Sequence, residues 1–78
     1  MKEPTAFSEA LGGRLRQRRQ ELCLSLGDVC ARTEISKAHL WAIERGTTSV
    51  GANLVYRLAL LYDVSCDWLM ARETTILP

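Results

Sequence analysis

The chain of 78 residues is poor in aromatic side chains, with one Phe, two Trp and two Tyr, and it has a single histidine, His39. Its three cysteines are an odd number, are widely spaced, form no CxxC pair and have no neighbouring histidine. These absences predict reduced, mostly packed thiols at Cys23, Cys30 and Cys66, and neither a zinc site nor a disulfide framework.

Several catalytic arrangements are missing as well. No paired carboxylates lie near the histidine, no nucleophile is spaced with it for a triad, and no GxGxxG or phosphate loop occurs. We therefore expect no catalytic residues, no metal, no cofactor and no small-molecule ligand. An enzyme is the least favoured class of function.

Long hydrophobic runs are also lacking. No apolar run approaches the roughly 20 residues of a membrane span, and the N-terminus has neither the continuous apolar region nor the cleavage site of a secretory signal. We expect a cytoplasmic protein with no membrane partner. Hydrophobic residues make up 47% of the chain and charged residues 24%, which is typical of one small globular domain.

The net charge is only +1, but the positive charge is concentrated in one part of the chain. Residues 51–78 hold two basic and three acidic residues, whereas residues 11–50 hold seven basic and four acidic ones. This distribution suits a surface that faces phosphates. The seven basic residues are Arg14, Arg16, Arg18, Arg19, Arg32, Lys37 and Arg45.

The segment 25–46 predicts two short helices joined by a tight turn. Ser25 is a good N-cap, with Asp28 at the capping-box position, and Ser36 is a second N-cap. Gly46 is a typical C-terminal stop. Helices this short must pack on neighbours, and the arrangement is that of a helix-turn-helix. The expected helices span residues 26–33 and 37–45.

Three further helices are predicted around this pair. The first begins at Phe7 or Ser8; Gly12 and Gly13 each weaken it by about 1 kcal/mol relative to Ala, which indicates either close approach of another backbone or a later helix start. The others are an amphipathic helix over 52–62 and a short one after Ser65, whose Trp68 is expected in the core. The buried stripe of the first helix is expected to be Phe7, Leu11, Leu15 and Leu22.

The central segment has a capped helix, a small residue at its fifth position, an Ile before the second cap and a closing Glu-x-Gly. This pattern resembles the phage repressor family of helix-turn-helix proteins, the Cro and C1 type (XRE family), and the likeness extends to LRQRR at 15–19 and VSCDWLM at 64–70. It implies an all-α, five-helix lambda-repressor-like DNA-binding domain over residues 8–72, with the helix-turn-helix at helices 2 and 3. The residues that meet the central pattern are Ser25, Cys30, Ile35, Ser36, Glu44, Arg45 and Gly46.

The segments outside the motif have expected roles as well. Residues 1–7 are expected to be a flexible N-terminus, and residues 73–78 a tail that is either frayed or part of a partner contact. In relatives, the residues matching Arg19 and Glu44 form a buried ion pair that ties helix 1 to the recognition helix. The alternative for these two residues is a pair of solvated surface charges.

By the same resemblance, the helix over 37–45 enters the major groove of double-stranded DNA. Lys37 can donate to guanine, and Ala38 and Ala42 can contact a thymine methyl. The expected base-reading residues are Lys37, Ala38, His39, Trp41 and Ala42. The expected phosphate contacts are Ser25, Leu26, Gly27, Arg14, Arg16, Arg18, Arg45, Thr47 and Thr48.

Three residues depart from the family pattern. Leu26 stands where many relatives have a phosphate-clamping Gln, which leaves only backbone donors there. Trp41 replaces a polar reader, so that it contacts either DNA or another protein. Glu34 replaces a turn Gly, and a positive φ at Glu34 would cost on the order of 1 kcal/mol.

A single motif gives a small footprint, so the resemblance implies a homodimer on a pseudopalindromic operator. The expected function is that of a sequence-specific transcriptional regulator, a repressor associated with the nucleoid of a bacterium or with a phage. The sequence does not distinguish a repressor from an antitoxin or a restriction controller. The alternative function is a protein-interaction module of the same fold that has lost DNA binding. The dimer interface is expected among Leu54, Tyr62, Trp68, Met70 and the tail.

Overall fold

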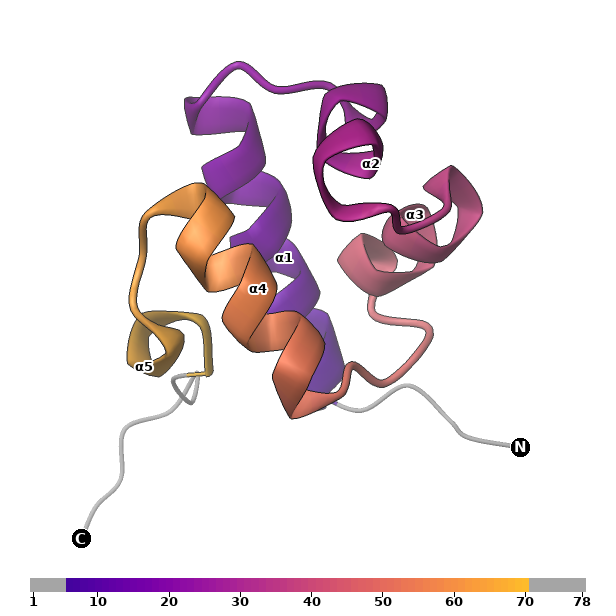
Figure 1. Ribbon diagram of the computed structural model, residues 1–78. Coiled ribbons are helices and arrows are strands. Elements are labelled where there is room, and N and C mark those ends of the chain that lie inside the picture. The colour runs from indigo at the N-terminus through magenta and orange to yellow at the C-terminus, as the bar shows by residue number, and fades with distance from the viewer. Residues whose placement is uncertain (1–5, 71–78) are drawn as a thin grey trace, which may run out of the picture.

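The computed structural model describes residues 6–70, and this part of the chain is built from five helices with no strand (Figure 1). Helix α1 packs against α3, α4 and α5, while α2 packs on α3. The predicted all-α, five-helix architecture is confirmed. The helices are α1 (Ala6–Glu21), α2 (Leu26–Thr33), α3 (Lys37–Arg45), α4 (Ala52–Tyr62) and α5 (Cys66–Met70). The N-terminus that was expected to be flexible, residues 1–7, and the predicted C-terminal tail, residues 73–78, lie almost entirely outside the described residues.

The helix ends are fixed by the residues that the sequence indicated. The hydroxyl of Ser25 accepts from the amide of Asp28 while the Asp28 carboxylate accepts from the Ser25 amide, which completes a capping box at α2. Ser36 caps α3 through the amide of His39, and Ser65 caps α5 through the amide of Trp68. The boundaries of the central helices could be predicted because each has such a local signal.

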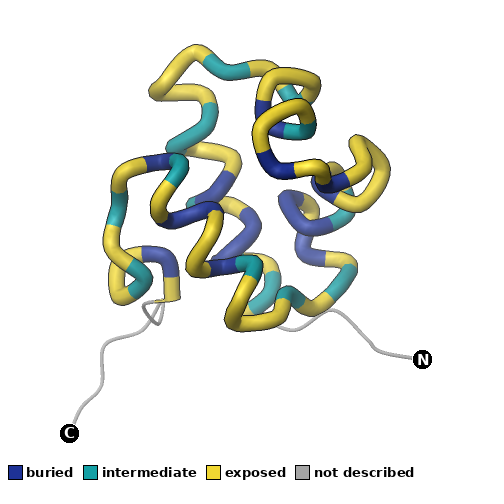
Figure 2. The backbone as a smooth tube through the Cα atoms, in the orientation of Figure 1, coloured by how far each residue is buried: buried dark blue, intermediate teal, exposed yellow. Residues whose placement is uncertain are grey.

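The core lies where the helices face one another (Figure 2). The predictions for three aromatic or aliphatic residues are wrong: Phe7 is 44% exposed, and Leu22 and Trp68 are each 37% exposed. Phe7 lies in the first turn of α1, and Leu22 directly follows its last residue. The buried hydrophobic residues are Leu11, Leu15, Val29, Ile35, Leu40, Ile43, Val55, Leu58, Ala59, Tyr62 and Leu69.

Helices α1 and α3 can cross closely because Gly12 has no side chain. A Cβ atom at Gly12 would collide with the main-chain carbonyls of Ile43 and Glu44, whereas a Cβ atom at Gly13 would meet nothing within 4 Å. Of the two explanations offered by the sequence, close backbone approach therefore holds for Gly12, and the helix does not begin later.

Two arginines tie helix ends to their neighbours. Arg18 of α1 donates from Nε to the carbonyl of Tyr62 at the end of α4, at 2.8 Å. Arg57 of α4 donates from Nη2 to the carbonyl of Thr33 at the end of α2, at 2.6 Å. Both contacts satisfy carbonyls that the helix itself leaves without a partner. They hold α4 in place behind the helix-turn-helix.

Within residues 6–70, three non-glycine residues have a left-handed backbone: Cys23, Glu34 and Asp63. Glu34 ends α2 with φ 65°, and its amide donates to the carbonyl of Cys30. The thiols of all three cysteines are free, and Cys23 is exposed rather than packed as expected. No helix within residues 6–70 has the length and apolar character needed to cross a bilayer.

Candidate nucleic-acid interface

Helix α3 turns one side into the core and leaves the other uncovered. Leu40, Ile43 and Glu44 are buried. The predicted base-reading residues are on the opposite side: Lys37, Ala38, His39 and Trp41 are exposed and Ala42 is half-buried. The described part of the chain therefore presents the five residues as one open helix face.

Trp41 is the largest group on this face and is 52% exposed. The guanidinium carbon of Arg45, one turn later on α3, lies 4.5 Å from the centroid of the indole ring. A cation over an aromatic face is attracted by the ring quadrupole, so Arg45 restricts the orientations of Trp41. This contact was not predicted from the sequence, although the four-residue spacing on a helix is a signal for it.

The N-terminus of α2 borders the same surface. The amides of Leu26 and Gly27 belong to the first turn, where no earlier carbonyl of the helix can accept from them. The hydroxyl oxygen of Ser25 is already an acceptor in the capping box. Hydrogen bonds from Ser25, first from its amide, lower the pKa of the Asp28 carboxyl, which therefore stays ionised near this end of the helix.

A buried ion pair joins α1 to α3. Arg19 donates to Glu44 from Nε to Oε2 at 2.7 Å and from Nη2 to Oε1 at 3.0 Å, and Nη1 donates to the carbonyl of Leu24 at 2.9 Å. The pair that the resemblance implies is thus present with bidentate geometry, and the alternative of two solvated charges does not hold. The hydrogen bond to Glu44 raises the pKa of Arg19, so that its guanidinium stays charged.

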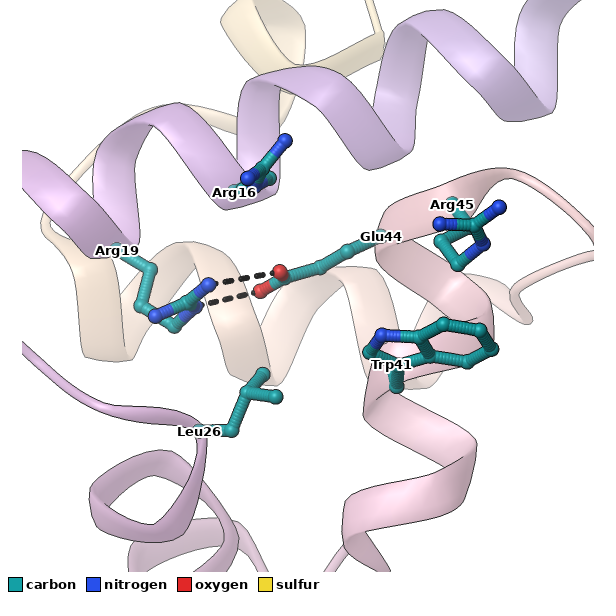
Figure 3. Close-up of a pocket in the computed structure, with 6 residues that line it drawn as sticks. All are labelled: Arg16, Arg19, Leu26, Trp41, Glu44 and Arg45. Atoms are coloured by element: carbon teal, nitrogen blue, oxygen red, sulfur yellow. Dashed lines mark hydrogen bonds and ion pairs between the residues drawn. The ribbon is translucent and has the colours of Figure 1, made fainter.

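Four of the predicted contact residues line one hollow of about 490 Å³, together with the ion pair (Figure 3). Arg16 reaches it from α1, Leu26 from the start of α2, and Trp41 and Arg45 from α3. The carboxylate of Glu44 is neutralised by Arg19, which leaves Arg16 and Arg45 as the cations that determine the local charge. The hollow joins the start of α2 to the open face of α3.

A family model for the helix-turn-helix domain matches residues 10–70. The chain belongs to the helix-turn-helix domain family. No curated protein matches the chain.

Solved structures share the fold of this helix-turn-helix domain. One is the crystal structure of the DNA-binding domain of BldD, whose sequence is 26% identical to this chain. The TM-score is 0.75, and the match covers 90% of this chain and 99% of that chain. The S. venezulae BldD DNA-binding domain is 26% identical with a TM-score of 0.76, over 85% and 99% of the two chains. The restriction-modification controller protein C.AhdI from Aeromonas hydrophila is 25% identical with a TM-score of 0.77, over 83% and 98%.

The helix-turn-helix domain does not bring all the predicted phosphate contacts to the hollow. Arg18 is committed to the carbonyl of Tyr62 and to Glu21, with a 3.3 Å ion pair to the latter. Arg14 lines a different hollow, between α1 and Trp68 of α5. Thr47 donates its hydroxyl to the carbonyl of Ala42, at the end of α3. Thr48 donates its hydroxyl to the carbonyl of Ser49.

Proposed function

We propose that this helix-turn-helix domain binds double-stranded DNA in a sequence-specific way and acts as a transcriptional regulator. The observation that carries the proposal is the open face of α3 beside the arginine-lined hollow, because a reading helix needs uncovered side chains flanked by cations. The similarity to the BldD DNA-binding domains and to a restriction-modification controller supports it.

In this proposal α3 lies in the major groove and the other helices hold the phosphate backbone. Lys37, at the start of α3, donates to guanine O6 and N7, while Ala38 and Ala42 contact thymine methyl groups. Arg16 and the first-turn amides of α2 hold phosphates, which fix the register of the helix. Arg18 is assigned to the fold instead, since its guanidinium is already bound to Tyr62 and Glu21.

We further propose that the domain binds a pseudopalindromic operator as a homodimer. The expectation that Tyr62 belongs to the dimer interface is wrong, because this side chain has no exposed surface. Apolar side chains that could be covered by a second copy lie on α4 and α5, away from the open face of α3. They are Tyr56, Leu60, Trp68 and Met70, which are 56%, 65%, 37% and 43% exposed.

Selection of bound sequences from a random pool of duplex DNA tests the function. We expect an enriched half-site repeated with two-fold symmetry, and an affinity whose logarithm falls with the logarithm of salt concentration by about 0.9 per phosphate contacted. Lys37→Ala should relax the preference at one base pair. The absence of binding to any duplex at low ionic strength would contradict the proposal.

The second candidate is a protein-interaction module of the same fold. It is favoured by the apolar side chains Ala38 and Trp41 on α3 and Leu26 beside them. A partner bound through these residues would be held largely by apolar burial, so its affinity would change little with salt. The salt dependence therefore separates the two candidates.

A further inference from the structure

The open face of α3 is unusual in its chemistry. Trp41 has about half of its surface exposed, Ala38 is exposed and Ala42 is half-buried. Lys37 and His39 are the polar members of the predicted reading set, and both are at the start of the helix. Beyond this start, the groups of the face that could donate a hydrogen bond to a base edge are the indole N–H of Trp41 and the guanidinium of Arg45, which lies over the indole.

A second apolar side chain, Leu26, stands on another helix at the same hollow. Leu26 and Trp41 line it together with Arg16 and Arg45, as Figure 3 shows. The two cations favour an anionic occupant such as the DNA backbone, and the two apolar groups favour a hydrocarbon group within reach of that backbone. Duplex DNA offers this combination in its major groove, where the C5-methyl of thymine is the apolar group displayed by the base pairs.

We infer that Trp41, with Leu26 beside it, recognises the C5-methyl group of thymine in the bound site, and that Arg45 is a positioning residue for Trp41. This inference rests on the proposed function. The stack with Arg45, at 4.5 Å, holds the indole in place before DNA arrives, so little side-chain freedom is lost on binding. The recognised feature is a methyl group rather than a donor and acceptor pattern.

Replacement of thymine by deoxyuridine tests this directly, because the two bases pair identically with adenine and differ only in the methyl group. In a duplex selected by the wild-type protein, each thymine is replaced in turn and the dissociation constants are compared. At one or two positions per half-site, we expect the loss of the methyl to weaken wild-type binding about fourfold, the effect of burying one methyl-sized group.

Variants then assign the effect to side chains. The ratio to compare is that of the dissociation constants for the deoxyuridine-containing and thymine-containing duplexes. Trp41→Ala should bring this ratio at those positions to about one, and Trp41→Phe should keep part of the difference. Lys37→Ala is the matched control: it should lower affinity but leave the ratio unchanged. Arg45→Gln removes the cation that is attracted to the ring, so it should reduce the ratio.

The outcomes separate this inference from the proposed function. Tight binding with no sensitivity to any thymine methyl, or a ratio that Trp41→Ala leaves unchanged, would overturn the methyl recognition while DNA binding stands. An unchanged ratio in Arg45→Gln would overturn the positioning role. Failure to bind any duplex at low salt would instead remove the proposed function. Because Trp41 is half exposed, the thermal midpoint of its variants should match that of the wild type.

Discussion

Gly12 lies against the main chain of Glu44, so that a Cβ atom at Gly12 would stand 2.7 Å from the Glu44 carbonyl oxygen. Helices α1 and α3 are also joined by the Arg19–Glu44 ion pair. The angle at which α3 leaves the body of the protein is therefore determined by a backbone contact and a charged contact that lie about two turns apart on α1.

The first prediction compares the two neighbouring glycines of α1. Gly12→Ala should lower the free energy of unfolding by about 1–3 kcal/mol, because the new methyl group forces α1 and α3 apart. Gly13→Ala should raise it by about 0.5–1 kcal/mol, since alanine favours the helix and the site is open. Chemical denaturation measures both. Equal effects of the two changes would show that the close approach of α3 is not what requires glycine.

The second prediction separates a phosphate contact from a structural arginine. Arg16→Gln should reduce the slope of log affinity against log salt by about 0.9 and leave stability unchanged, because Arg16 is exposed at the hollow. Arg18→Gln should lower stability, because the carbonyl of Tyr62 loses its donor, and should leave the slope unchanged. Binding isotherms at several salt concentrations and thermal unfolding of both variants give the comparison. A slope that changes only in Arg18→Gln would reverse the two assignments.

The third prediction concerns the buried Tyr62. Burial, and then the nearby Glu44 carboxylate, raise the pKa of Tyr62 to about 12. An unfolded tyrosine ionises near pH 10, so the folded state keeps a proton that the unfolded state has lost. Stability should therefore be intact below pH 10 and fall as pH rises towards 12, by about 3 kcal/mol in total.

Tyr62→Phe isolates this effect. Within residues 6–70 the Tyr62 hydroxyl has no hydrogen-bond partner, so its removal should raise stability near pH 7 by about 1 kcal/mol. The variant should also lose the decline attributed to Tyr62 between pH 10 and 12. Denaturant unfolding across this pH range measures this loss: the free energy of unfolding of the variant should fall less steeply with pH than that of the wild type. A variant whose alkaline decline is as steep as the wild type's would contradict the assignment.

The fourth prediction concerns the turn of the helix-turn-helix. Glu34 has φ 65°, in the left-handed region that glycine adopts without cost. Glu34→Gly should raise the free energy of unfolding by roughly 1 kcal/mol. Asp63→Gly, at φ 57°, is the matched control. It should raise the free energy of unfolding by less, because aspartate tolerates this conformation better than glutamate. Loss of stability in Glu34→Gly would mean that the glutamate side chain has a role of its own.

The helix boundaries could be predicted because their signals are local. Ser25, Ser36 and Gly46 act within one turn of the chain, and the structure uses each of them as the sequence indicated. Exposure at the ends of α1 could not be predicted in the same way. Phe7 and Leu22 continue an apolar stripe, but whether a stripe is covered depends on the positions of other helices.

Some features of the candidate site could likewise be predicted from the sequence, and others could not. Its residue types and their helix could be predicted from the resemblance, but the assignment of individual cations depends on tertiary contacts. Arg16 and Arg18 are two residues apart in one basic run, and only the placement of α4 explains why Arg18 is bound to a carbonyl. The stack of Arg45 on Trp41 is local and had a recognisable spacing.

Helix α3 divides cleanly into an inner and an outer side. Leu40 and Ile43 are wholly enclosed, whereas Lys37, Ala38 and Trp41 support no part of the core. Mutations on the outer side can accordingly accumulate without unfolding the domain. Evolution can retarget such a protein by exchanging a few solvent-facing side chains, while the lineage keeps the same scaffold.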